Sequence, residues 1–186
     1  MNIRLNFDIN IGELNEVKKQ KIQQIFKLDF PGAISLPNQL VLTGNEEQII
    51  LTPIQMQYTF NHEYFDKIQA NIVKVQELLM LEQVINNMTI VISSLKDLND
   101  NIREYTKSKF GSLISDSVGI GKREFFLYNQ NLSEIKIEPF INDNKKIYIE
   151  AMYNINSKLI SQITDVLNGV SGDYNKKEEE IFKKLK

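Results

Sequence analysis

Hydrophobic and polar residues alternate in several separate stretches of this 186-residue chain. Alternation with a period of two is typical of a strand with one buried and one solvated face. Strands are predicted in this way at residues 3–9, 54–60, 135–138 and 147–155. Apolar stretches next to turn residues predict further strands at 40–43, 48–51 and 124–128, and a short apolar stretch at 89–92 indicates a strand buried on both faces. Residues 44–47 predict a hairpin turn, whereas Pro31-Gly32 and Pro37-Asn38 predict a loop.

Apolar spacings of three and four residues separate these stretches and predict helices. The predicted helices cover residues 14–26, 65–85 and 159–167. Ser94–Asp97 is similar to a capping box and predicts that a further helix begins there and ends at Gly111. Gly169 should end the 159–167 helix, so residues 173–186 should form a separate, charged C-terminal helix.

These elements predict an α+β protein with one domain over residues 1–186. We expect a curved antiparallel sheet of about six strands, packed on one face by the two most regular helices. The chain contains no internal repeat, low-complexity linker or change in composition that would divide it into two domains.

Composition removes several classes of function. The chain has no cysteine and one histidine, which excludes a disulfide scaffold, a thiolate metal site, a cysteine nucleophile and a multi-histidine metal centre. The 22 basic and 24 acidic residues give a net charge of −2, and no basic stripe of the kind that binds nucleic acid is visible. The sequence shows neither a membrane-spanning stretch nor a signal peptide, so we expect a cytoplasmic protein that binds no membrane.

Two local features invite a chemical interpretation. His62 lies where a predicted strand gives way to a helix, and the absence of a nucleophile motif beside it favours a structural role over catalysis. Residues 119–123 contain two glycines and two cations, but they lack the remaining glycine and the Ser or Thr of a phosphate-binding loop. A turn between two elements is the simpler interpretation.

Asp116, Glu134 and Lys136 form the best enzymatic hypothesis. An acid followed at a distance by Glu-x-Lys on a strand would suit a Mg²⁺-dependent nuclease, in which the carboxylates hold the metal and the lysine activates water. The polar face of an exposed strand would carry the same residues.

Most of the chain resembles a sporadically distributed bacterial family of uncharacterised α+β proteins. The resemblance covers roughly residues 40–186 and rests on the order of elements and on three segments. These are Leu51-Thr52-Pro53 leading into Met56-Gln57-Tyr58, the strand Ile147–Asn154, and the tail Glu180-Ile181-Phe182. Thr89–Ile92 stands where the family has an Arg-x-Gly-Leu-Arg-Tyr strand. The resemblance implies a fold, but no reaction and no catalytic residues.

We therefore expect a non-enzymatic protein that binds another protein and needs no cofactor or metal. Tyr148, Glu150 and Met152 are the predicted partner-binding residues, because their positions in the strand place them opposite the buried Ile147 and Ile149. The partner could be a different protein or a second copy in a homodimer. Phages and mobile elements encode many small cytosolic binders, so an inhibitor or immunity-type protein of such an element is one context for this expectation. A small-ligand-binding module, with an apolar pocket between sheet and helix, is the remaining alternative.

Overall fold

The computed structural model describes residues 1–82, 84–98, 101–110 and 120–185, and within them the fold is α+β with one open antiparallel sheet. The sheet has nine strands among these residues, so the expected number of about six was wrong. The strands are β1 (Asn2–Asp8), β2 (Gly32–Leu36), β3 (Gln39–Thr43), β4 (Glu47–Leu51), β5 (Gln55–Phe60), β6 (Val84–Asp97), β7 (Lys122–Tyr128), β8 (Asn131–Pro139) and β9 (Lys146–Leu159). The helices are α1 (Glu16–Phe26), α2 (Phe65–Leu79), α3 (Ile102–Phe110) and α4 (Ile163–Leu185), with a 3₁₀ turn at Ile160–Gln162.

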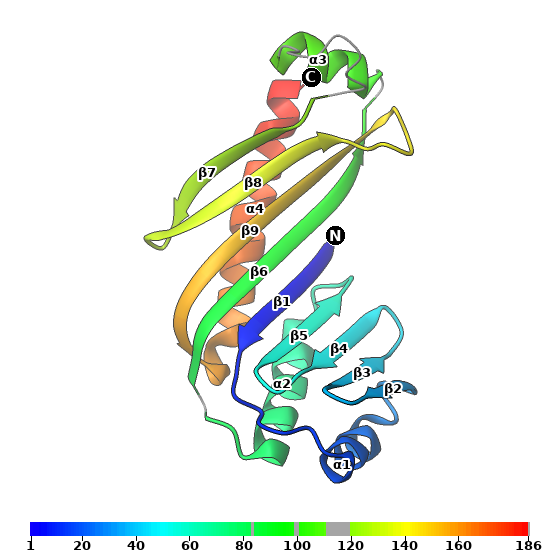
Figure 1. The fold of residues 1–186 in the computed structure, drawn as a ribbon. Coiled ribbons are helices and arrows are strands. Elements are labelled where there is room, and N and C mark those ends of the chain that lie inside the picture. The colour runs from blue at the N-terminus through cyan, green and yellow to red at the C-terminus, as the bar shows by residue number, and fades with distance from the viewer. Residues whose placement is uncertain (83, 99–100, 111–119, 186) are drawn as a thin grey trace.

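The strands follow the order β2-β3-β4-β5-β1-β6-β9-β8-β7 across the sheet (Figure 1). Strand β1 therefore joins two antiparallel groups, β2–β5 on one side and β6–β9 on the other. Strands β6 and β9 are the longest, with 14 residues each, and they pair along almost their whole length. The β6–β9 pair is therefore the longest strand pair of the sheet.

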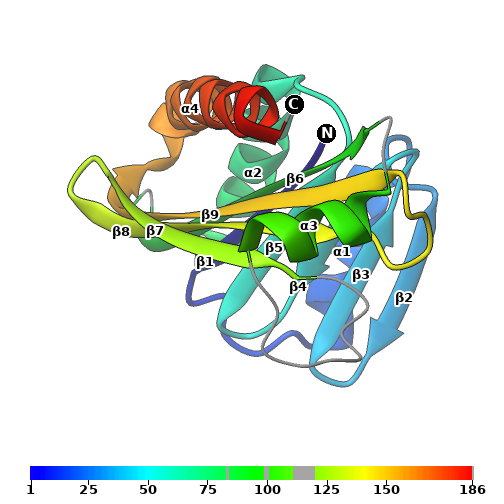
Figure 2. The same cartoon turned by 90° about the horizontal axis from the view of Figure 1, so that it is seen from above.

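Helices α2 and α4 cover one face of the sheet, and α3 lies across one end of it (Figures 1 and 2). Helix α1 packs beside α2 against β3. The core between the helices and the sheet takes alternate residues of each central strand. Its fully buried side chains include Leu5, Tyr58, Ile90, Tyr153 and Val170. Since the buried residues of the strands follow a period of two, the alternation seen in the sequence specifies this face correctly.

Two strands differ from the prediction because tertiary contacts decide them. Residues 32–36 form β2 instead of a loop, and Pro37-Asn38 is its two-residue turn into β3. Ser94–Asp97 does not begin a helix but continues β6. The Ser94 hydroxyl bonds to the Tyr174 hydroxyl at 2.8 Å and to Glu178, which ties this part of β6 to α4.

Helix α4 runs without a break from Ile163 to Leu185, so the predicted separate helix over 173–186 is the second half of one longer helix. Gly169 does not end α4. A β-carbon at this glycine would lie 2.9 Å from the Tyr128 hydroxyl, and the glycine therefore permits the close approach of the β7–β8 hairpin to the helix. The predicted helix end at Gly111 lies outside the described residues.

Candidate interaction surface

The face of the sheet opposite α2 and α4 is the most distinctive surface of the described residues. Strand β9 places Ile147, Ile149 and Ala151 in the core, and their alternation with Tyr148, Glu150 and Met152 turns these three side chains to the opposite face. All three are half-buried there. The predicted partner-binding residues thus lie together, next to β8, on the face that neither α2 nor α4 covers, which we call the helix-free face.

A polar network connects β8 and β9 on this face. Lys136 stands directly opposite Glu150, and its Nζ lies 2.7 Å from Glu150 Oε1. The Tyr148 hydroxyl donates a hydrogen bond of 2.7 Å to Glu150 Oε2. Both carboxylate oxygens of Glu150 therefore have a partner, and the carboxylate is held in a fixed position.

The charges of this network stabilise one another. Partial burial would raise the pKa of Glu150, but the hydrogen bonds from Lys136 and Tyr148 outweigh it and hold that pKa below its usual value. The hydrogen bond to Glu150 raises the pKa of Lys136. Both groups are thus charged at neutral pH, and the network presents an ordered ion pair to any partner.

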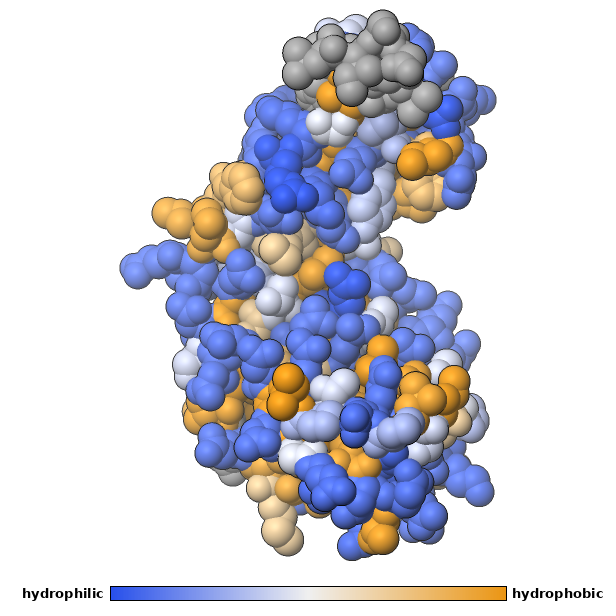
Figure 3. All heavy atoms as spheres, in the orientation of Figure 1, coloured by the Kyte–Doolittle hydropathy of each residue, from blue (hydrophilic) through white to orange (hydrophobic). Residues whose placement is uncertain are grey.

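An apolar cluster lies beside this network on the β7–β8 hairpin. Phe125 is 63% exposed, Leu127 73% and Leu132 59%. Leu127 and Leu132 stand opposite each other in the pairing of the two strands. Figure 3 shows this face as largely hydrophilic, with apolar atoms at its edge over β7 and the beginning of β8, and others near the β8–β9 turn and over β2–β5.

We define the β7–β9 face as the surface made by the cluster and the network together. Its residues are Phe125, Leu127, Leu132, Lys136, Tyr148, Glu150 and Met152. The sequence analysis named the β9 residues of this face as partner-binding, which stays a prediction, and it named none of the apolar residues. A signal was present, because residues 125–128 are all apolar or aromatic. A strand of that kind has apolar side chains on both faces, so one face must expose them unless both are covered.

The residues of the nuclease hypothesis are only partly described. Glu134 and Lys136 share the helix-free side of β8, where Glu134 Oε2 lies 3.5 Å from Arg123 Nη1 and Lys136 pairs with Glu150. Each is therefore engaged with a different neighbour. Asp116 lies outside the described residues, so the hypothesis stays a prediction.

Residues 119–123, which contain the two glycines and two cations, are also only partly described. Gly119 lies outside the described residues, and Lys122 and Arg123 belong to β7. Lys122 forms an ion pair with Glu124, and Arg123 faces Glu134. Each cation is thus paired with an acid, Lys122 within β7 and Arg123 across to β8.

Within the part of the chain that the structure describes, several ionisable side chains gather around Glu47 on β4. Glu47 Oε2 accepts a hydrogen bond of 2.6 Å from Tyr58, and Oε1 lies 2.8 Å from Lys67 Nζ and 3.0 Å from His62 Nε2. The backbone N–H of Tyr64 donates to His62 Nδ1, which leaves the proton of a neutral imidazole on Nε2, facing Glu47.

This group joins the β4–β5 hairpin to the first turns of α2. Asn71 of α2 donates a hydrogen bond of 2.8 Å to the Tyr58 hydroxyl and completes the connection. The Glu47 side chain is 4% exposed, and its oxygens are already occupied by their three partners. We therefore interpret the group as structural, and His62 as one of its members.

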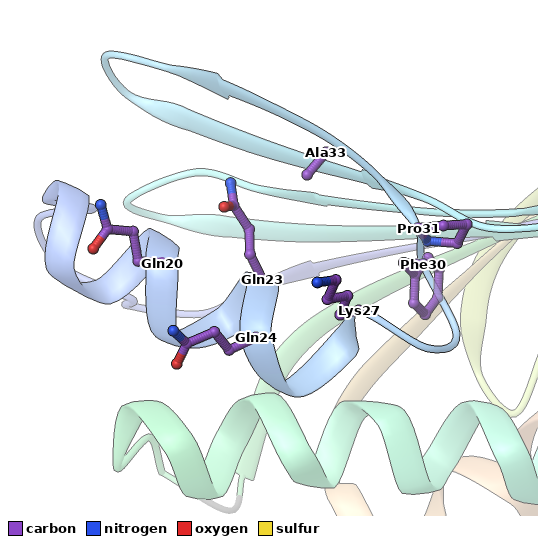
Figure 4. Close-up of a pocket in the computed structure, with 7 residues that line it drawn as sticks. All are labelled: Gln20, Gln23, Gln24, Lys27, Phe30, Pro31 and Ala33. Carbon is purple, nitrogen blue, oxygen red and sulfur yellow. The ribbon is translucent and has the colours of Figure 1, made fainter.

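A shallow cavity of about 330 Å³ lies between α1 and the edge strand β2 (Figure 4). Its lining is Gln20, Gln23, Gln24, Lys27, Phe30, Pro31 and Ala33. Amides dominate the helix side, which differs from the apolar pocket that the small-ligand alternative predicts. A second groove of about 300 Å³, at Lys96 and Phe182, lies along α4.

Neither the grouping of side chains, nor the composition of the helices, nor similarity to known proteins assigns a function to the chain. Within the described residues, no cluster of three or more histidine, aspartate or glutamate side chains is arranged to hold a metal ion. None of the described helices combines the length and the apolar character needed to cross a membrane. No protein-family model matches the chain, and no curated protein is significantly similar to it in sequence. The resemblance noted for residues 40–186 stays a prediction.

Proposed function

We propose that this chain is a non-enzymatic protein-binding module that docks a partner protein on the β7–β9 face. The observation that carries the proposal is the exposure of three large apolar side chains, Phe125, Leu127 and Leu132, on one hairpin. Solvent-exposed apolar clusters bordered by polar groups are typical of protein-binding surfaces.

The arrangement supplies the two components that protein interfaces use. The apolar cluster is the anchor, because most of its surface is still in contact with water and each side chain would contribute roughly 1 to 3 kcal/mol on burial. The Lys136–Glu150–Tyr148 network lies beside it and is already ordered, so binding costs little side-chain entropy there. We expect the network to determine orientation and the cluster to determine affinity.

The test compares two variants of equal chemistry on the same side of the sheet. Leu132→Asp introduces a charge in the middle of the cluster, and Leu36→Asp introduces the same charge on β2, which lies at the far edge. Tagged wild type and both variants are used to capture partners from the native lysate, and each captured protein is then purified and titrated by calorimetry. We expect Leu132→Asp to weaken binding by roughly thirtyfold or more and Leu36→Asp to bind as the wild type does.

Two results would contradict the proposal. One is a purified partner that binds wild type and Leu132→Asp equally well. The other is the absence of any partner that binds the wild type in the purified titration. Circular dichroism of all three proteins is the control that the substitutions leave the fold intact.

A further inference from the structure

Strand β7 is an edge of the sheet, and the described residues place no strand on its outer side. It is joined to β8 by a two-residue turn, Asn129-Gln130, in which both residues have positive φ (46° and 66°). A turn of this type makes the flanking pair, Tyr128 and Asn131, hydrogen-bonded. Hydrogen-bonded pairs then alternate along the ladder.

This alternation determines which backbone groups of β7 are without a partner in the sheet. Lys122, Glu124, Phe126 and Tyr128 direct their N–H and C=O groups toward β8. Arg123, Phe125 and Leu127 direct theirs outward. Phe125 and Leu127 also carry exposed apolar side chains, so the described residues cover neither the outward backbone groups nor these side chains of the edge.

The opposite edge of the sheet differs. Strand β2 has five residues, and its two-residue turn at Pro37-Asn38 leaves only Ala33 and Ser35 with outward groups. Their side chains are small. Edge strands usually carry a bulge, a proline or a charge that prevents pairing. Strand β7 carries charges of both signs at its beginning, Lys122, Arg123 and Glu124, whereas residues 125–128 contain no charge, proline or bulge.

The sequence of β7 is compatible with pairing to a second copy of itself. A two-fold axis at Phe125 places Phe125 opposite Phe125, and Arg123 of each copy opposite Leu127 of the other. All three outward residues then meet outward residues, and each of the three pairs forms two backbone hydrogen bonds. No like charges stand opposite each other in this register.

The neighbouring registers are less favourable. An axis at Glu124 would place two carboxylates opposite each other, and an axis at Arg123 would do the same with two guanidinium groups. An axis at Phe126 would pair only Phe125 with Leu127 and would leave the outward groups of Arg123 without a partner in the strand. The Phe125 register alone uses the whole edge.

We propose that two copies of this chain associate by antiparallel pairing of β7 with β7 about an axis at Phe125. The product is one continuous sheet of twice nine strands, in which the β7–β9 faces of both copies lie side by side. The occupant of this edge is thus a second copy of the chain. The inference rests on the backbone of β7 and is independent of any partner bound on the face.

A pair of opposite charges at position 127 tests the register. Leu127 is 73% exposed, so neither substitution should alter the fold. Leu127→Lys places a cation opposite Arg123 of the other copy, and Leu127→Glu places an anion there. By analytical ultracentrifugation over a wide range of concentration, we expect the wild type to reach twice its mass of 21.6 kDa. Leu127→Lys should raise the dimer dissociation constant roughly tenfold or more, and Leu127→Glu should not.

A proline pair tests the role of the backbone. Phe125→Pro removes an outward N–H and leaves the bonds to β8 intact, which edge strands tolerate. Ala33→Pro makes the same change on β2 and is the matched control. We expect Phe125→Pro to be monomeric and Ala33→Pro to dimerise as the wild type does.

Cross-linking tests the position of the axis, and the chain has no cysteine of its own that would interfere. A cysteine at position 125 lies about 5.5 Å, Cα to Cα, from its copy, whereas a cysteine at 123 lies four residues further along the strand. A short bismaleimide should link Phe125→Cys and not Arg123→Cys. A wild type that stays monomeric at all concentrations overturns the inference, as does a dimer that Phe125→Pro and Leu127→Lys leave unchanged.

Discussion

At the scale of single residues, the Glu47 carboxylate forms hydrogen bonds with three neighbouring side chains. Burial would raise its pKa, but the hydrogen bonds from Lys67, Tyr58 and His62 outweigh burial and hold the pKa below its usual value. A carboxyl whose pKa is lower in the folded state stabilises the protein above its unfolded pKa of about 4.3, and that stabilisation is lost as the pH falls through the folded value.

We therefore expect Glu47→Gln to lower the free energy of unfolding by about 1 to 3 kcal/mol at neutral pH. The difference from the wild type should shrink as the pH falls below about 4.3, because the wild-type carboxylate is then protonated as well. Urea denaturation at a series of pH values measures both effects. Glu13→Gln, at an exposed carboxylate, is the control and should change little. A pH-independent difference between Glu47→Gln and the wild type would contradict the prediction.

Ser133 presents the opposite situation. It is 1% exposed on the core side of β8, and its hydroxyl has no hydrogen-bond partner among the described residues. Because a buried hydroxyl without a partner costs free energy, we expect Ser133→Ala to be neutral or to stabilise by up to about 1 kcal/mol.

Ser94 is the matched control for this substitution, since it lies on the same face in β6 but bonds to Tyr174 and Glu178. Ser94→Ala should lower the free energy of unfolding. Thermal and urea denaturation of the two variants should thus give effects of different sign or size. Equal destabilisation by both would indicate that Ser133 has a partner in solution.

At the scale of elements, the end of α2 shows a local strain that a substitution can remove. Met80 follows the last residue of the helix with φ 53° and ψ 42°, in the left-handed region, and is 93% exposed. Glycine adopts this conformation without steric cost, and it is the residue preferred at this position.

We expect Met80→Gly to raise the free energy of unfolding by roughly 0.5 to 1 kcal/mol. Met80→Ala keeps a β-carbon and hence the strain, so it should give no comparable gain. Chemical denaturation of the two variants separates loss of the methionine side chain from relief of the backbone. A gain in the alanine variant as large as in the glycine variant would refute the explanation.

Elements that depend on local pattern alone were predicted well. The alternation of residues 147–155 identified both the strand and the face that Tyr148, Glu150 and Met152 occupy. Elements decided by distant contacts were not. Ser94–Asp97 has the residues of a helix cap, but Tyr174 and Glu178, 80 and 84 residues away, hold Ser94 in a strand. Local propensity is a weak guide where such contacts compete with it.

The same distinction applies to the site. Parity along a strand tells which side chains share a face, and it placed Lys136 and Glu150 on polar sides of their strands. It does not tell which strand is an edge or which face the helices leave open. The exposure of Phe125 and Leu127 depends on both, since β7 follows β8 at the end of the sheet. The exposure of these apolar side chains can therefore be recognised only when the order of all strands in the sheet is known.

At the scale of the whole molecule, β1 connects two groups of strands that would otherwise be separate sheets. Leu5 at its centre is fully buried between Tyr58 of β5 and Ile90 of β6. If the two groups of strands unfold as one cooperative unit, a destabilising substitution at Leu5 must lower the stability of both groups.

Leu5→Ala is therefore the decisive substitution, and it should lower the free energy of unfolding by about 2 to 5 kcal/mol. In native-state hydrogen exchange, we expect the slowest amides of the wild type in β1, β6 and β9, since these strands are paired on both sides and lie over the core. Leu5→Ala should reduce protection by the same free energy in β4 and in β9, although these strands lie on opposite sides of β1. Leu28→Ala, at a residue that is 97% exposed, is the control and should leave protection unchanged. A loss confined to β2–β5 would mean that the β6–β9 strands and α4 fold independently, because a shared core transmits a local loss to every strand that it holds.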